Sequence, residues 1–349
     1  MENNFSKNLF YCTSLVITDK KGKPYHGRTM EFSTDQIPSS ISYYPKGTFF
    51  QAISPDGSKA HAYTAAYAIL GIGIPMAENG EGLAYELCEG FNSAGLSFSL
   101  NMMPNSELPE IQPSAYPNSI PFDTLGHWAL AICATVEEVK EKIQHLALWS
   151  RAIAQIGGIV SPFHFAFYDK QGGSIVIEVS AKNLHIYDNP TKVMTNGPEF
   201  SWHLTNLHNY THLTNQDVSV NTLGNMNLRQ PDCGIATVSL PASDTSVDRF
   251  IRAVFYTTFA NQVEEAEDAI LELSHIMNKF DRPKNMTLTQ QGEGGEVNGA
   301  GLVSEFTVWT SLSDLTRGTL YVRSYKQLNY LTYSLAQFKE ETKPVHFLV

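Results

Sequence analysis

The sequence has 349 residues, 42% of them hydrophobic and 17% charged, with a formal net charge of −11 at pH 7. This composition is that of a globular protein with a large core, and the acidic balance argues against the basic surface that a nucleic-acid backbone requires. No apolar run reaches the length of a membrane-spanning helix, so neither a nucleic acid nor a membrane is an expected partner.

The first predicted elements form a β-hairpin that begins at a cysteine. Residues 13–18 and 26–32 read as strands, and the turn segment DKKGKP separates them. Cys12 stands at the head of the first strand, behind eleven residues that lack the apolar region of a secretory signal. The hairpin would bring Arg28 back beside Cys12, whereas Glu31 would face the other side of its strand unless a bulge intervenes.

Strands and helices then alternate in large blocks along the chain. A capping box of Thr135 and Glu138 opens one helix, and two more are expected over 247–260 and 263–277. No linker long enough to divide the chain is present. This order of elements predicts layered sheets covered by helices. Further strands are expected near 62–68, 83–88, 95–101, 163–169, 174–180, 305–312 and 319–324.

Familiar nucleotide and metal motifs are absent from the sequence. There is no G-x-G-x-x-G after a strand, no P-loop, no H-E-x-x-H and no G-x-S-x-G. The four cysteines include no C-x-x-C pair. His203, His208 and His212 lack an acid or cysteine at a matching spacing, so we interpret them as surface histidines or as supports behind a site. We expect neither a metal nor a cofactor.

Cys12 has a chemical reason to stand at the start of a chain. A cysteine attacks a carbonyl group as its thiolate and therefore needs a base. The α-amino group of a first residue, with an ordinary pKa of about 7.7–8.0, is such a base. This interpretation requires that residues 1–11 are a leader that is removed. Arg28 would lower the thiol pKa; a cross-strand ion pair without chemistry is the alternative from the residues alone.

Several segments together resemble the choloylglycine hydrolase and penicillin V acylase family, whose members are N-terminal-nucleophile hydrolases of linear amide C–N bonds. They occur in the family's order over nearly the whole chain. The resemblance implies an α+β fold of four layers, αββα, with two mostly antiparallel sheets covered by helices, formed as a single domain by residues 12–349. The segments are CTSL at 12–15, GRTMEF at 27–32, GFNSAGL at 90–96, VMTNGPEF at 193–200, HLTNL at 203–207, DRFIR at 248–252, TVWTS at 307–311 and DLT at 314–316.

The resemblance also implies a role for each site residue. Cys12 would be the nucleophile and, through its freed amine, the base, and Arg28 would favour the thiolate. Glu31 stands where the family has an aspartate that holds the α-amino group, and it is one methylene longer. The side-chain amide of Asn196 would help to form the oxyanion hole. Arg249 matches the family's second active-site arginine.

The remaining parts of the expected site are less closely specified. A second oxyanion donor, a backbone N–H, falls on Met102 by ungapped counting or on Asn101 with a shift of one residue, and we prefer Asn101. The substrate pocket is expected in the loops 33–46, 54–61 and 102–121, with aromatic candidates Tyr43, Tyr44, Phe49 and Phe50.

The predicted function is hydrolysis of a small N-acyl amide through a thioester, as in a penicillin V acylase or a bile salt hydrolase, by a homotetramer. The alternatives are an acyl-homoserine lactone acylase, a catalytically inactive relative that binds or supports other molecules, and a papain-like hydrolase. The last would place its cysteine at a helix start. The sequence as given favours the cytoplasm; a trimmed signal segment would indicate the periplasm or secretion.

Overall fold

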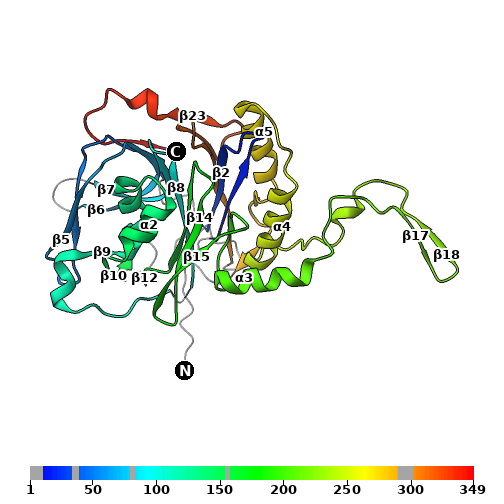
Figure 1. The fold of residues 1–349 in the computed structure, drawn as a ribbon, viewed down its shortest axis with the longest axis horizontal. Coiled ribbons are helices and arrows are strands. Elements are labelled where there is room, and N and C mark those ends of the chain that lie inside the picture. The colour runs from blue at the N-terminus through cyan, green and yellow to red at the C-terminus, as the bar shows by residue number, and fades with distance from the viewer. Residues whose placement is uncertain (1–10, 34–38, 79–82, 105, 154–157, 290–301) are drawn as a thin grey trace.

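The computed structural model describes residues 11–33, 39–78, 83–104, 106–153, 158–289 and 302–349 (Figure 1). Two large sheets face each other, and helices cover the outer face of each sheet. The predicted hairpin and the predicted αββα layering are both confirmed. The shorter strands outside the two sheets are β4 (Phe49–Ile53), β5 (Lys59–Thr64), β9 (Ser119–Pro121), β10 (Ala147–Trp149), β11 (Ala152–Ile153), β12 (Ile159–Val160), β19 (Leu288–Thr289) and β20 (Val303–Ser304).

The first large sheet contains the hairpin that starts at the cysteine. Its strands are antiparallel neighbours in the order β16-β1-β2-β21-β22-β23. The register of β1 and β2 places Cys12 opposite Met30 and Ser14 opposite Arg28. Arg28 is therefore the diagonal neighbour of Cys12 on one face. The bounds are β16 (Val193–Met194), β1 (Tyr11–Thr18), β2 (Pro24–Phe32), β21 (Phe306–Asp314), β22 (Thr319–Ser324) and β23 (Leu331–Ser334).

The second large sheet is also antiparallel, in the order β15-β14-β13-β8-β7-β6-β3-β24. The strand expected at 62–68 is confirmed only in its first three residues, which form the end of β5 and pair with β4. The connection from β5 to β6 runs through residues 65–68, whose Ala66 N–H bonds to the carbonyl of Ala131 at a helix end, not to a strand. The bounds are β15 (Asn183–Asp188), β14 (Ser174–Ser180), β13 (Phe163–Asp169), β8 (Leu96–Met102), β7 (Leu83–Asn92), β6 (Ile69–Glu78), β3 (Ser40–Tyr44) and β24 (Val345–Leu348).

Helices α1 (Leu125–Ile132) and α2 (Val136–Ile143) cover the second sheet, and α4 (Ser246–Thr258) and α5 (Ala266–Met277) cover the first. The predicted capping box opens α2, since Thr135 Oγ1 accepts the N–H of Glu138 at 3.3 Å. Helix α5 begins three residues later than expected. The sequence did not predict α1, because it is buried on nearly all sides and has no polar face. A shorter helix, α3 (Phe200–Asn206), follows β16.

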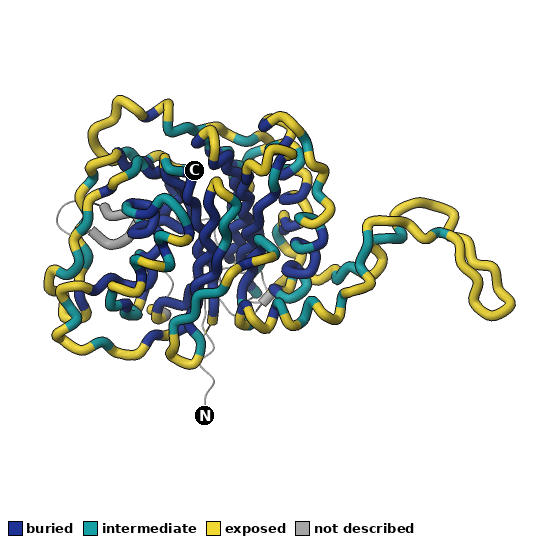
Figure 2. The backbone as a smooth tube through the Cα atoms, viewed as in Figure 1, coloured by how far each residue is buried: buried dark blue, intermediate teal, exposed yellow. Residues whose placement is uncertain are grey.

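A buried polar layer joins the two sheets at their centre. Nε2 of His26 lies 3.0 Å from Ser14 Oγ and 3.1 Å from Ser99 Oγ, and Ser14 also meets the hydroxyl of Tyr168 at 3.0 Å. Figure 2 shows the buried strands of both sheets in the middle of the molecule. The layer between the sheets is therefore partly polar, and Cys12 and Arg28 lie within it.

An arm projects from the layered body between α3 and α4 (Figures 1 and 2). It carries the hairpin of β17 (Val220–Leu223) and β18 (Met226–Arg229), all of whose residues are exposed. Within the described parts of the chain, no helix combines the length and apolarity needed to cross a lipid bilayer.

Candidate active site

Cys12 and Arg28 lie side by side on the face of the first sheet that is turned toward the second. Nη2 of Arg28 donates to Sγ of Cys12 at 3.3 Å and to the carbonyl of Leu100 at 2.6 Å, and Nη1 donates to the carbonyl of Cys88. Sδ of Met30 lies 3.6 Å from the same Sγ. Both Cys12 and Arg28 are fully buried. The strand register thus produces the pair that the sequence predicts.

Glu89 places a buried carboxyl group beside Arg28. Its Oε2 lies 3.8 Å from Nε of Arg28, and its Oε1 accepts from the hydroxyl of Ser311. Burial raises the pKa of Glu89 to about 7, although the charge of Arg28 opposes this. Burial also raises the pKa of the Cys12 thiol, while the charge of Arg28 lowers it. Arg28 is a cation and cannot take the thiol proton, so the thiol of this closed site needs a separate base.

Asn196 connects the start of β1 to Arg249 of α4. Its Oδ1 accepts the N–H of Cys12 at 3.0 Å and Nη2 of Arg249 at 2.7 Å. Nη1 of Arg249 donates to the carbonyl oxygen of Cys12 at 2.6 Å and to Thr13 Oγ1 at 2.8 Å. Because Oδ1 accepts both donors, the amide nitrogen is turned the other way, toward the carbonyl of Met102 at 2.9 Å. Burial lowers the pKa of Arg249 to about 10, so the guanidinium stays charged at neutral pH.

The backbone of Asn196 is held by hydrogen bonds on both sides. The N–H of Asn196 donates to Oγ of Ser246, the first residue of α4, at 2.9 Å. Its carbonyl oxygen lies 2.9 Å from Nε2 of the buried His203 in α3. His203 thus supports the site from behind, and His208 and His212 are exposed. Among the described residues, no group of three or more His, Cys, Asp or Glu side chains is arranged to hold a metal ion.

Glu31 lies at the bulge that the sequence left open, on the face of β2 turned toward α4. The pairing of β2 with β21 shifts register between Met30 and Glu31. Oε1 of Glu31 accepts from Thr307 Oγ1 at 2.9 Å, and Oε2 has no hydrogen-bond partner within the described chain. Burial raises the pKa of Glu31, and the charges of Arg249 and Arg282 oppose this. The nitrogen of Cys12, which is an amide in the full-length chain, donates to Oδ1 of Asn196.

The two candidates for the second oxyanion donor occupy different positions. The amide nitrogen of Asn101 donates to the carbonyl of Thr195 at 2.7 Å and so joins β8 to the segment before Asn196. Met102 is the last residue of β8, and its carbonyl oxygen accepts from Asn196. The backbone of Met102 therefore lies directly beside Asn196, while the side chain of Asn101 supports the neighbouring segment.

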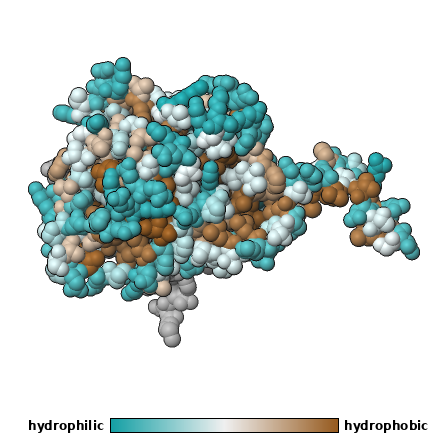
Figure 3. Space-filling model, in the orientation of Figure 1, coloured by the Kyte–Doolittle hydropathy of each residue, from teal (hydrophilic) through white to brown (hydrophobic). Residues whose placement is uncertain are grey.

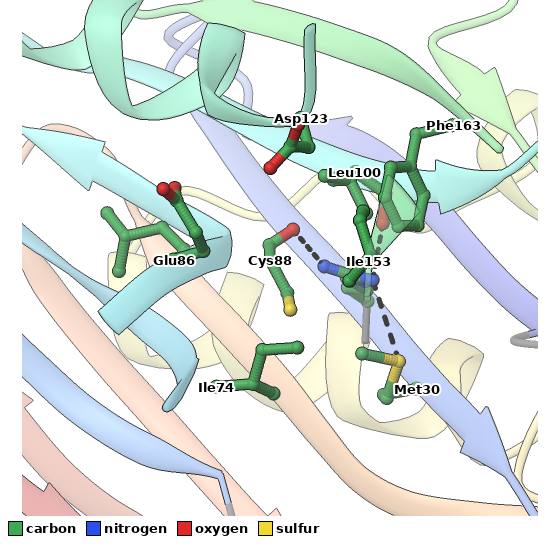
Figure 4. Close-up of a pocket in the computed structure, with 10 residues that line it drawn as sticks. Met30, Ile74, Glu86, Cys88, Leu100, Asp123, Ile153 and Phe163 are labelled. Atoms are coloured by element: carbon green, nitrogen blue, oxygen red, sulfur yellow. Dashed lines mark hydrogen bonds between the residues drawn. The ribbon is translucent and has the colours of Figure 1, made fainter. Parts of the chain in front are cut away.

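A cavity lined mainly by apolar side chains extends from the residues that contact Cys12 (Figure 4). No described residue of the expected loops lines it, and its wall comes mainly from strands β2, β6, β7 and β8. None of the four aromatic candidates lines it. The ring of Tyr43 is 5.1 Å from that of Phe338, the ring of Tyr44 is 5.5 Å from that of Phe50, and Phe49 is 64% exposed. The lining residues are Arg28, Met30, Ile74, Glu86, Leu87, Cys88, Leu100, Asp123, Ile153 and Phe163.

Sequence reasoning missed three residues that touch the core of the site. Met30 contacts the sulfur, Glu89 faces Arg28, and Ser246 holds Asn196. The position of Glu89 could have indicated its role, since an acidic residue inside an apolar strand is expected to have a buried partner. Met30 and Ser246 left none, because an apolar strand residue and a serine near a helix start have ordinary structural roles.

The sequence matches the family described as linear amide C–N hydrolases, choloylglycine hydrolase family, over residues 12–343. A bile salt hydrolase/transferase of Clostridium perfringens is 29% identical over 318 residues, which cover 90% of this chain and 89% of that protein. A penicillin V acylase of Pectobacterium atrosepticum is 24% identical over 255 residues, which cover 72% and 60% respectively.

Solved structures show the same fold. An arginine-to-leucine variant of the conjugated bile acid hydrolase from Clostridium perfringens superimposes with a TM-score of 0.80 at 24% identity, covering 97% of both chains. The penicillin V acylase of Agrobacterium tumefaciens gives 0.74 at 19% identity, covering 96% of this chain and 90% of its own. The family match over nearly the full length therefore identifies this chain as a member of the choloylglycine hydrolase family of linear amide C–N hydrolases.

Proposed function

We propose that this protein, once residues 1–11 are removed, hydrolyses the amide bond of a small N-acyl substrate through a thioester on Cys12. The observation that carries the proposal is the pair of contacts at one residue: Arg28 donates to the sulfur of Cys12, and Asn196 accepts from its nitrogen. Nucleophile and base would then belong to the same residue.

Removal of the leader supplies the missing base. The family match begins at Cys12, which supports a mature chain that starts there. Residues 1–10 lie outside the described structure; Tyr11 forms the first position of β1. Cleavage of the Tyr11–Cys12 bond turns an amide nitrogen into an α-amine with an ordinary pKa of about 7.7–8.0. The neighbouring charge of Arg249 favours the neutral, basic form of that amine.

The reaction then follows from the positions of these groups. The α-amine takes the thiol proton as Sγ attacks the substrate carbonyl, and Arg28 stabilises the thiolate. Asn196 and the backbone N–H at Met102 or Asn101 stabilise the oxyanion. The amine product leaves with the proton from the α-ammonium. Water, activated by the α-amine, hydrolyses the thioester and restores the thiol.

Glu31 has a defined place in this scheme. Its Oε2 has no hydrogen-bond partner among the described residues, and Glu31 pairs in register with Tyr11, the residue before Cys12. The new α-ammonium would be a cationic partner for that carboxylate. An inactive relative remains the competing proposal, because Glu31 carries one methylene more than the family's aspartate.

The arm supports assembly of several copies, which we propose to be a homotetramer as the family resemblance implies. Three apolar side chains of its hairpin are about two-thirds exposed, namely Val220 at 65%, Leu223 at 62% and Met226 at 66%. Figure 3 shows hydrophobic residues along the same arm. A second copy of the chain would remove this surface from water.

A panel of amides tests the proposed activity. Processed protein is incubated with penicillin V, glycocholate, taurocholate and an acyl-homoserine lactone, and the released amine is measured. We expect cleavage of at least one compound and none by Cys12→Ala. Cleavage by Cys12→Ala at the wild-type rate would contradict the proposal.

A further inference from the structure

We propose that Glu86, Asp123 and Arg151 form the far end of the substrate cavity and that this end selects an acyl group bearing a hydroxyl. The inference rests on the proposed function, since it specifies the acyl group of the same site.

The cavity connects this group to the nucleophile. Arg28 and Met30 both contact Sγ of Cys12 and both line the cavity, whose wall also includes Glu86 and Asp123. Figure 4 shows the carboxylates of Glu86 and Asp123 on one side of the cavity and Met30 on the other. The remaining wall is mainly apolar. An acyl chain whose carbonyl lies at Cys12 would therefore run along apolar side chains toward two carboxyl groups.

Asp123 and Arg151 satisfy each other. Asp123 is 4% exposed, and Nε of Arg151 donates to its Oδ1 at 3.2 Å and to its Oδ2 at 3.0 Å. Nη2 of Arg151 donates to Oδ2 at 2.5 Å. This forked geometry engages the guanidinium edge with one carboxylate. Arg151 is thus already neutralised, and it leaves little positive charge for an anionic substrate group.

Glu86 has a carboxyl oxygen that makes no hydrogen bond with the described residues. Its nearest cation is Arg151, with Oε1 3.5 Å from Nη2, a distance too long for a strong hydrogen bond. Oε2 is buried and has no hydrogen-bond partner among the residues that the structure describes. Burial and the charge of Asp123 raise the pKa of Glu86 to about 8, although Arg151 opposes this. At neutral pH, Glu86 is mostly a neutral carboxyl group that can both donate and accept a hydrogen bond.

A hydroxyl is the group that matches this arrangement. A methyl end would leave Oε2 unpaired, and a carboxylate would meet Asp123 without a free cation. An ammonium would find no net negative charge, because Asp123 and Arg151 cancel while Glu86 is neutral. A hydroxyl is neutral, gives and takes one hydrogen bond, and leaves the charges of the group unchanged.

Binding of inert analogues tests this selection without turnover. In acyl methyl ketones, a methyl group replaces the amide nitrogen and its substituent, and the acyl chain can end in a methyl, a hydroxyl, an ammonium or a carboxylate. Titration calorimetry on the wild-type protein gives Kd for each ending at several chain lengths. At the best-fitting length, we expect the hydroxyl analogue to bind about tenfold more tightly than the methyl analogue, the effect of one hydrogen bond.

Two substitutions of Glu86 test whether this residue causes the preference for a hydroxyl ending. Glu86→Gln keeps a neutral group that donates and accepts, so the preference should remain. Glu86→Leu removes the polar group, so methyl and hydroxyl endings should bind equally. Glu141→Leu, on the exposed side of α2, is the matched control and should behave as wild type. Thermal unfolding of each variant checks that it is folded.

The pH dependence of binding gives a second readout, for which Glu86→Gln is the control. As the pH rises through about 8, Glu86 becomes charged, and a carboxylate ending should bind progressively more weakly. Two groups at the Cys12 end of the cavity also titrate near this range, namely Glu89 with a pKa of about 7 and the α-amine of a processed chain with an ordinary pKa of about 7.7–8.0. The same titration on Glu86→Gln, which should lose the weakening, separates their effect from that of Glu86. Burial raises the pKa of Cys88 to about 12 and raises the pKa of Tyr63 still further, so neither of these groups titrates near pH 8. Arg28 at the opposite end stays charged.

The outcomes separate this inference from the proposed function. Equal binding of methyl and hydroxyl endings, tighter binding of an ammonium or carboxylate ending, or an unchanged preference in a folded Glu86→Leu variant would overturn the selection. If amides are cleaved without a hydroxyl preference, only the selection fails. If the hydroxyl preference is observed but no amide is cleaved, the proposed selection is supported and the proposed hydrolytic function is contradicted.

Discussion

The backbone nitrogen of Cys12 lies 3.0 Å from Oδ1 of Asn196, although 184 positions separate the two residues. Arg249 donates to the same oxygen and to the carbonyl of Cys12, so three distant segments meet at one peptide unit. If this nitrogen becomes an amine, base, nucleophile and oxyanion donor stand together without any local sequence motif.

Replacement of Asn196 by alanine should lower kcat by about 10²–10³-fold, because it removes one oxyanion donor. Steady-state kinetics of the processed variant measure this effect. Asn261→Ala, at an exposed position, is the control and should leave kcat unchanged. A loss below threefold (about 0.7 kcal/mol of barrier) would show that Asn196 does not hold the oxyanion.

Replacement of Arg28 by leucine should raise the pKa of the Cys12 thiol, because the donor at 3.3 Å and its positive charge are lost. The rate of iodoacetamide alkylation against pH reports this pKa. Cys233 is the exposed cysteine of the described chain, so both proteins carry Cys233→Ser. Arg28→Leu also leaves Glu89 without its buried partner, so unfolding should become easier by about 3–5 kcal/mol. An unchanged alkylation profile would contradict the role of Arg28.

Acid should destabilise the protein partly through His26. Burial lowers the pKa of this histidine from 6.5 to about 3. The unfolded chain therefore binds a proton between these pH values that the folded chain does not, and stability falls with falling pH by up to about 1.4 kcal/mol per unit. Urea unfolding at several pH values should show a shallower dependence for His26→Gln, and the exposed His212→Gln should retain the wild-type slope. Equal slopes for all three proteins would refute this effect.

Replacement of apolar residues on the arm by serine should dissociate the proposed tetramer. Leu223→Ser with Met226→Ser removes two exposed apolar side chains of the hairpin without touching the layered body. Light scattering should give the mass of four copies for the wild type and a smaller mass for the double variant. A wild-type mass of one copy would disprove the tetramer.

The sequence predicts those elements of the fold that are determined by residues close together in the chain. The hairpin at Cys12 and the capped helix at Thr135 were predictable because turn, cap and apolar spacing are local signals. Helix α1 was not, since burial around its whole circumference hides the helical period. The strand expected at 62–68 ends at Thr64, because the N–H of Ala66 bonds to the carbonyl of Ala131 in α1 and not to a neighbouring strand.

The residues of the candidate site likewise fall into those that the sequence predicts and those that only the structure reveals. Cys12, Arg28, Asn196 and Arg249 could be proposed from segments that resemble a family, and the structure brings them into contact. The group at the far end of the cavity could not, because Glu86, Asp123 and Arg151 come from three separated segments and none stands in a motif. Charge pairing across sequence distance is visible only in three dimensions.

The central claim is that the amine and the thiol of one terminal residue act together. Its most direct test compares amide hydrolysis by two preparations whose intact masses are measured: chains that begin at Cys12, and chains kept at full length by replacement of Tyr11 with proline. We expect turnover only from chains that begin at Cys12. Equal turnover by chains that retain residues 1–11 would contradict the account, because their Cys12 nitrogen is an amide and cannot accept the thiol proton.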